Sequence, residues 1–229
     1  MDQKFLNARS PLRLLEKGLH GGLGAGNLGI VLAGHGVGKT SFLVGVAMDE
    51  LLREGRVLHV SLSHSVAHVR AHYDTVYEEL ANSKHLEDQR LIHRDVDAHR
   101  SVRVYPPGSL TVAKLREAVE TESQAAGPPS LIIIEGANLS EMSRAEAMEL
   151  KSLANELDAE IWLESASSDE REVSATPEVE AIDDLLSVVL ALEPTDGVMK
   201  LRAIKDHDNP DVSDLHVSLD PRTLLLVRS

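Results

Sequence analysis

The sequence predicts an α/β fold, in which helices flank a mostly parallel sheet and β-hairpins form its C-terminal edge. Over the first two thirds of the chain, short apolar runs alternate with amphipathic stretches, which is typical of β-α-β units. In the last third, short apolar runs are separated only by turns, which indicates antiparallel hairpins. The 229 residues are enough for one well-buried domain and short for two, so we expect residues 1–229 to form a single domain.

The expected strands are short apolar runs, and the expected helices are stretches whose apolar residues share one face. In the first two thirds, strands are expected at residues 28–33, 56–62, 102–105, 131–134 and 161–163. Helices are expected at residues 39–53 and 65–82, around residues 112–119, and at residues 147–157. Residues 83–100 read equally as a loop or a weak helix, and residues 165–182 as an acidic loop. The remaining strands are expected at residues 188–192, 200–204, 215–219 and 223–227.

Composition and charge limit the classes of function. The absence of cysteine excludes disulfides, thiolate metal sites and thiol nucleophiles. The formal net charge of -14 disfavours nucleic-acid binding, which usually needs a basic face, and its simplest role is solubility. No apolar run is long enough to span a bilayer, and the N-terminus lacks the apolar core of a secretory signal. We therefore expect a cytoplasmic protein with no membrane span.

A glycine-rich segment lies between the first expected strand and the helix that follows it. It matches the P-loop pattern G-x-x-x-x-G-K-[ST] except at its first position, and reads Ala33-Gly34-His35-Gly36-Val37-Gly38-Lys39-Thr40. Glycines let backbone N–H groups turn toward phosphate oxygens, and the helix N-terminus adds a positive dipole end. We expect Lys39 to reach the β- and γ-phosphates and Thr40 to bind Mg²⁺, with Ser41 beside them. The alternative is a chance match in a glycine-rich turn.

Other segments extend the pattern along nearly the whole chain. They occur in the order Gly21-Gly22-Leu23, Leu58 to Ser63, Leu131 to Glu135, Leu150 to Ala154, Ile161 to Ser165, and Leu201 to His207. In this order they resemble the RecA-like P-loop ATPases, especially the KaiC and DnaB branch. The resemblance implies Mg²⁺ and a nucleotide as cofactors. ATP is favoured over GTP because the sequence has no Asn-Lys-x-Asp motif that would recognise guanine.

The departures from the family pattern fall on catalytic positions. The catalytic Glu of the family corresponds to Ser63, the Walker B Asp to Glu135, and the phosphate-sensing Gln to Ser165. A serine hydroxyl is not a comparable base near neutral pH. The family's Lys-x-Arg pair, which reaches the nucleotide of a neighbouring subunit, corresponds to Lys205 and His207. Hydrolysis is therefore expected to be slow or absent, unless Glu135 or Glu164 has taken over as the base.

Two further features have competing interpretations. His64, His68 and His72 are four residues apart, so one helix would place them on one face. Such a face can bind Zn²⁺ or Ni²⁺, but a polar helix face near the nucleotide or a subunit boundary explains it as well. The acidic segment 165–184 is either a solvated loop or a surface that repels DNA.

The leading hypothesis is an ATP-binding regulatory or assembly module that forms a homo-oligomer or binds a protein partner. In this hypothesis, ATP orders a subunit interface and Lys205 contacts the nucleotide of the neighbour. The enzyme alternative is an active oligomeric ATPase in which Glu135 is the base and Lys39 stabilises the phosphates. A DNA-dependent motor or recombinase is the third hypothesis, and the acidic charge argues against it.

Overall fold

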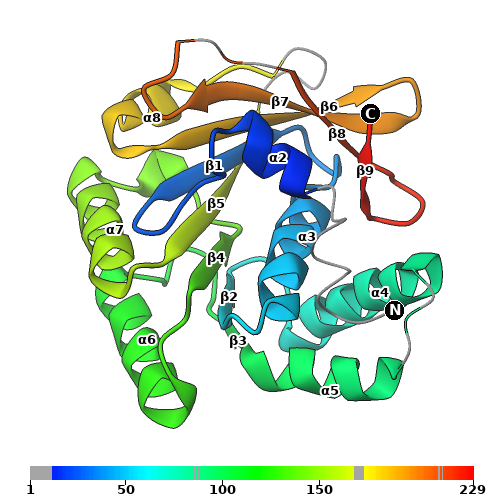
Figure 1. Cartoon of the computed structure of the whole chain (residues 1–229). Helices are drawn as coiled ribbons and strands as arrows, with labels where there is room; N and C mark the ends of the chain where they lie inside the picture. The colour runs from blue at the N-terminus through cyan, green and yellow to red at the C-terminus, as the bar shows by residue number, and fades with distance from the viewer. Residues whose placement is uncertain (1–11, 85, 87, 168–172, 211, 213) are drawn as a thin grey trace.

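The computed structural model describes residues 12–84, 86, 88–167, 173–210, 212 and 214–229, and it is built around a single twisted sheet (Figure 1). Within these residues the sheet has nine strands in the order β3-β2-β4-β5-β1-β6-β7-β8-β9. The strands are β1 (Leu28–Ala33), β2 (Val57–Ser61), β3 (Arg100–Val104), β4 (Leu131–Glu135), β5 (Glu160–Ala166), β6 (Val188–Thr195), β7 (Val198–Asp206), β8 (Asp214–Leu219) and β9 (Leu226–Arg228).

The helices connect these strands and cover both faces of the sheet. They are α2 (Leu12–Gly18), α3 (Lys39–Leu52), α4 (Val66–Lys84), α5 (Gln89–His99), α6 (Val112–Ala126), α7 (Arg144–Leu157) and the short α8 (Pro177–Glu180), with 3-10 turns η1 (Leu139–Glu141) and η2 (Asp183–Leu185). Figure 1 shows α6 and α7 on one face of the sheet and α3, α4 and α5 on the other. Two hydrophobic clusters fill the space between the sheet and these two layers.

The pairing of the strands confirms the predicted fold class. Strands β3, β2, β4, β5, β1 and β6 pair in parallel, whereas β6, β7, β8 and β9 pair antiparallel. The hairpin between β6 and β7 turns through Asp196 and Gly197, which have φ angles of 48° and 84°. Two consecutive positive φ angles match the twist of a two-residue hairpin loop, and Asp-Gly is a favoured sequence for it.

The core is tightest where β1 and β5 meet α3. Trp162 on β5 is 2% exposed and packs edge-on against Phe42 of α3, with ring centroids 5.8 Å apart. Gly29 on β1 makes room for this ring, because a Cβ atom there would lie 2.8 Å from Trp162. These contacts hold the first turn of α3 against β1 and β5.

Some element boundaries differ from the sequence prediction. Residues 89–99 form the helix α5, which resolves the choice between loop and helix for that segment. The strand expected at residues 223–227 begins only at Leu226, because Leu224 has a φ of 58° that extended backbone does not adopt. The acidic segment contains the short α8 and η2, and its residues Asp169, Glu170, Arg171 and Glu172 lie outside the described residues. None of the helices in the described part of the chain has the length and apolar character that a bilayer crossing requires.

Candidate functional site

The glycine-rich turn, residues 33–40, links β1 to α3 and adopts a backbone that only glycine tolerates well. Gly36 and Gly38 have φ angles of 73° and 106°. A Cβ on Gly38 would also lie 2.7 Å from Leu219, so this position is restricted by space as well as by backbone angle. Helix α3 begins at Lys39, and no side chain of the described residues caps its start. The N-terminal amides of α3 are therefore available to an anion.

Lys39 is folded back onto the glycine-rich turn. Its Nζ donates hydrogen bonds to the carbonyl oxygens of Ala33, at 3.2 Å, and Gly34, at 2.9 Å. Burial lowers the pKa of Lys39 from its ordinary value, and the nearby charge of Glu164 opposes this shift. The ammonium group would have to leave these two carbonyls to contact a bound anion in the cavity.

A row of polar residues crosses the carboxyl ends of β2, β4 and β5, on the face covered by α3. Ser61 is level with Glu135 in the parallel pairing of β2 and β4. Ile134 is level with Leu163 in the pairing of β4 and β5. The next residue along each strand is a glutamate, so Glu135 and Glu164 lie on neighbouring strands at the same level. Adjacent strands are about 4.8 Å apart, which places two buried carboxyl groups on neighbouring strands.

Glu135 is fully buried and accepts hydrogen bonds on both carboxylate oxygens. Thr40 Oγ1 donates to Oε1 and Ser61 Oγ donates to Oε2, each at 2.6 Å. His64 Nδ1 lies 3.1 Å from Oε1, and His59 Nε2 lies 3.5 Å from Oε2. Burial alone would raise the pKa of Glu135, but His59, Ser61 and Thr40 together hold it well below its ordinary value. Glu135 is therefore an ionised carboxylate that is fixed to the first turn of α3.

Glu164 lies in a different environment, although it is only one strand away. Its Oε1 accepts a hydrogen bond from the Gly136 backbone N–H at 3.0 Å. Its Oε2 is buried and has no hydrogen-bond partner among the described residues. Burial raises the pKa of Glu164, and the charge of Glu135 raises it further, against a smaller opposite effect of Lys39. The two neighbouring carboxyl groups therefore differ strongly in their affinity for a proton.

Histidines form one wall beside this row. His68 and His72 lie on α4, and His64 lies just before it; the His64 and His68 rings stack with centroids 4.3 Å apart. His72 Nε2 is 3.0 Å from Ser41 Oγ, and burial lowers the His72 pKa. The spacing of four residues thus places the three side chains along one side, although the helix itself begins only at Val66.

Sequence reasoning missed one histidine of this region. His59 is fully buried on β2, and its Nδ1 is 3.1 Å from the Tyr73 hydroxyl. The Arg100 guanidinium lies 4.4 Å above the Tyr73 ring. The available signal was a lone histidine inside the apolar run Val57-Leu58-His59-Val60, where a buried polar group needs a partner.

Residues of the glycine-rich turn, the histidines His64, His68 and His72, and Glu164 line a cavity of about 920 Å³. This volume is within the range of ~300–1,000 Å³ that is typical of small-molecule sites. Of the residues expected to bind a nucleotide, those that line it are His35, Gly36, Gly38, Lys39, Thr40 and Ser41. Ser63, His64, Glu164 and Ser165 line it too, and Glu135 is bonded to Thr40 at its edge. Gly34 contributes a carbonyl to Lys39, and Val37 packs partly buried against the core.

The donor set at the start of α3 fits a magnesium ion. The Thr40 hydroxyl and the Glu135 carboxylate are hard oxygen ligands, and they lie within hydrogen-bond distance of each other. Mg²⁺ prefers such oxygens and usually keeps several water molecules and substrate phosphates as its other ligands. The cavity opens beside Thr40, with the buried Glu135 directly behind it, and leaves room for water molecules and phosphates.

Lys205 is not brought to this cavity within its own chain. It lies on β7, and its Nζ donates to Asp183 of η2, at 2.8 Å to Oδ2. His207, the other half of the expected pair, is 2.9 Å from Asp206 Oδ1 through its Nδ1. Any contact between Lys205 and a nucleotide would therefore involve a different copy of the chain and would require its bonds to Asp183 to open.

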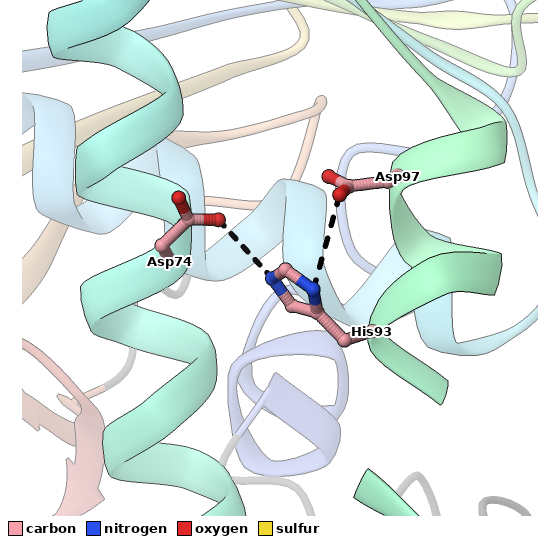
Figure 2. Close-up of side chains that lie close together, drawn as sticks. All are labelled: Asp74, His93 and Asp97. Atoms are coloured by element: carbon pink, nitrogen blue, oxygen red, sulfur yellow. Dashed lines mark hydrogen bonds and ion pairs between the residues drawn. The ribbon is translucent and has the colours of Figure 1, made fainter. Parts of the chain in front are cut away.

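A second polar cluster lies between α4 and α5, away from the cavity. Figure 2 shows His93 of α5 between Asp74 of α4 and Asp97 of α5. His93 Nε2 is 3.1 Å from Asp74 Oδ1, and Nδ1 is 3.8 Å from Asp97 Oδ2. Each ring nitrogen thus faces its own carboxylate, and Asp97 also binds Arg100 at 2.5 Å. This arrangement is that of an ion-pair cluster which ties α4 to α5.

No protein-family model matches this chain, and a search of curated proteins finds no significant match. The chemistry of the site is therefore interpreted from its own residues.

Proposed function

We propose that this protein binds Mg-ATP in the cavity at the carboxyl ends of β1, β4 and β5. The observation that carries the proposal is the hydrogen bond between Thr40 and Glu135, at 2.6 Å, beside an uncapped helix start and a half-buried lysine. Together these groups supply what a metal-bound polyphosphate needs: amides at a helix start, one cation, and two oxygen ligands for the metal. The P-loop pattern of the sequence supports the same conclusion.

Each residue has a definite role in this proposal. The amides from Gly36 to Thr40 would bind phosphate oxygens, and Lys39 would bind them too once it leaves the Ala33 and Gly34 carbonyls. Thr40 and Glu135 hold Mg²⁺, with Glu135 acting directly or through a water molecule. The metal, when bound, neutralises phosphate charge. The protein's own part is to hold these groups in place, because Phe42 of α3 packs against Trp162 of β5 and this ring lies against Gly29 of β1.

The same geometry supports slow turnover, as expected for a RecA-like regulatory or assembly module. Ser63 has no basic side chain to activate water, and Ser165 replaces an amide that would sense the γ-phosphate. The alternative, an active ATPase with Glu135 as the base, is less well supported. Glu135 is already engaged by Thr40 and Ser61, and its lowered pKa makes it a weak base.

Equilibrium binding of radiolabelled ATP tests the proposal. Wild-type protein should bind ATP saturably and in a Mg²⁺-dependent manner, and Lys39→Ala should bind it much more weakly. Arg116→Ala on α6 is a matched control: it also removes one cation, from a surface pair with Glu156 that is away from the cavity. Equal binding by wild type and Lys39→Ala would refute the proposed site.

Assembly is a separate part of the proposal, and size exclusion with and without Mg-ATP tests it. If the nucleotide orders a subunit interface, the apparent mass should rise when Mg-ATP is added, and Lys205→Ala should weaken this response. An unchanged elution volume at saturating Mg-ATP would refute the assembly role while leaving nucleotide binding intact.

A further inference from the structure

Glu135 and Glu164 form a pair of buried carboxyl groups with opposite properties. They lie next to each other across β4 and β5, on the same face of the sheet and at the same end. Only one of the two has a carboxyl oxygen that no donor of the described residues occupies. The hydrogen bonds of the two residues show that this oxygen belongs to Glu164. Glu135 accepts from Thr40 and Ser61, whereas one oxygen of Glu164 has no partner among the described residues.

The Glu164 side chain is well placed for chemistry in the cavity. It is 9% exposed and lines the same cavity as Lys39 and Thr40. The Gly136 N–H fixes one carboxyl oxygen and leaves the other without a competing donor.

Three other residues at the cavity are weaker candidates for a base. Ser63 carries a hydroxyl, and His64 already directs its Nδ1 toward Glu135 while its ring is stacked on His68. His72 is hydrogen-bonded to Ser41. Glu164 is the group at the cavity wall that combines a carboxylate, deep burial and an unsatisfied oxygen.

We propose that Glu164 is the general base for the slow hydrolysis of ATP in this site, an inference that rests on the proposed Mg-ATP binding. The water oxygen forms a bond to the γ-phosphorus, and the bond from the γ-phosphorus to the β–γ bridging oxygen breaks. ADP leaves with that electron pair, and the water proton passes to the Glu164 carboxylate. Release of this proton to the phosphate product or to solvent restores the base.

Glu164→Gln tests the inference with little structural change, because the amide oxygen can still accept from Gly136 N–H. Glu160→Gln is the matched control. Glu160 is on the same strand, half-buried and with a raised pKa, but it accepts from Gly24 N–H and Trp162 Nε1 at the other end of β5. The assay measures release of labelled γ-phosphate in a single turnover, alongside equilibrium binding of labelled ATP to each protein.

Glu164→Gln should keep its ATP affinity and lose ~10²–10⁴-fold in the rate of phosphate release, and Glu160→Gln should keep both. An unchanged rate in Glu164→Gln overturns the inference, as does an equal loss in Glu160→Gln. Wild-type protein that binds Mg-ATP but releases no phosphate also overturns it, while leaving the proposed binding function intact. Absence of ATP binding in the wild type would instead overturn the proposed function.

Discussion

The Ser61 hydroxyl offers the sharpest test of the buried polar row, because Ser61→Ala removes only one oxygen atom. This oxygen donates to Glu135 Oε2 at 2.6 Å and accepts from the His64 backbone N–H at 3.0 Å, in a side chain that is fully buried. A hydrogen bond to a charged group contributes ~1.5–3 kcal/mol, and the amide left unpaired adds to the loss. We expect the free energy of unfolding to fall by about 2–4 kcal/mol.

Urea denaturation, followed by the fluorescence of the single tryptophan, Trp162, measures this loss. Ser152→Ala is the matched control, because its hydroxyl also donates to a carboxylate, Glu156 at 2.8 Å, but on the exposed surface of α7. This control should leave the unfolding midpoint unchanged within error. Equal losses in the two variants would refute the argument that burial makes the Ser61–Glu135 bond strong.

The pH dependence of the Ser61→Ala effect has a definite sign. The pKa of Glu135 lies below its ordinary value of 4.5 in the folded protein, so its carboxylate stabilises the fold above that pH. The stabilisation is lost as the pH falls through the folded-state pKa. The difference between wild type and Ser61→Ala should therefore be full at neutral pH and shrink in strong acid. A difference that grows on acidification would contradict this assignment.

Three further variants test the packing and the second carboxyl group. Gly38→Ala should lower stability and ATP affinity, because it combines a φ of 106° with a Cβ 2.7 Å from Leu219; unchanged denaturation and binding curves would contradict this. Gly29→Ala should cost ~1–3 kcal/mol of unfolding free energy by crowding Trp162, and a shift in tryptophan emission should accompany the loss. Glu164→Gln should gain stability above pH 4.5, the ordinary pKa of a glutamate, because its raised pKa makes the ionised form costly to the fold. The difference in denaturation midpoint between Glu164→Gln and wild type should therefore be larger at pH 8 than at pH 4, and an equal difference at both would refute that last expectation.

The fold class and most helices and strands could be predicted from the sequence, because each of these elements is formed by residues that are neighbours in sequence. Alternating runs of apolar residues marked β1, β2, β4 and β5, and the structure confirms these strands. The turn from Gly34 to Lys39 was equally visible, because its glycines and the helix that follows are neighbours in sequence. The boundary of β9 could not be predicted, because it depends on a positive φ at Leu224 and leucine has no tendency toward that conformation.

The polar row was harder to predict because it depends on strand order and register. Ser61, Glu135 and Glu164 are separated by tens of residues, and they meet because β4 lies between β2 and β5. The sequence left Glu135 and Glu164 as alternative bases, and only their hydrogen bonds distinguish them. The bonds of Lys205 to Asp183 likewise follow from tertiary packing that no local pattern contains.

Isothermal titration of the purified protein with ATP is the most direct test of Mg-ATP binding in the cavity beside Lys39 and Thr40. With Mg²⁺ present, we predict saturable binding of one ATP per chain, which weakens sharply when Mg²⁺ is chelated and in Lys39→Ala. No heat of binding and no saturation with Mg-ATP, or equal binding by wild type and Lys39→Ala, would contradict the claim.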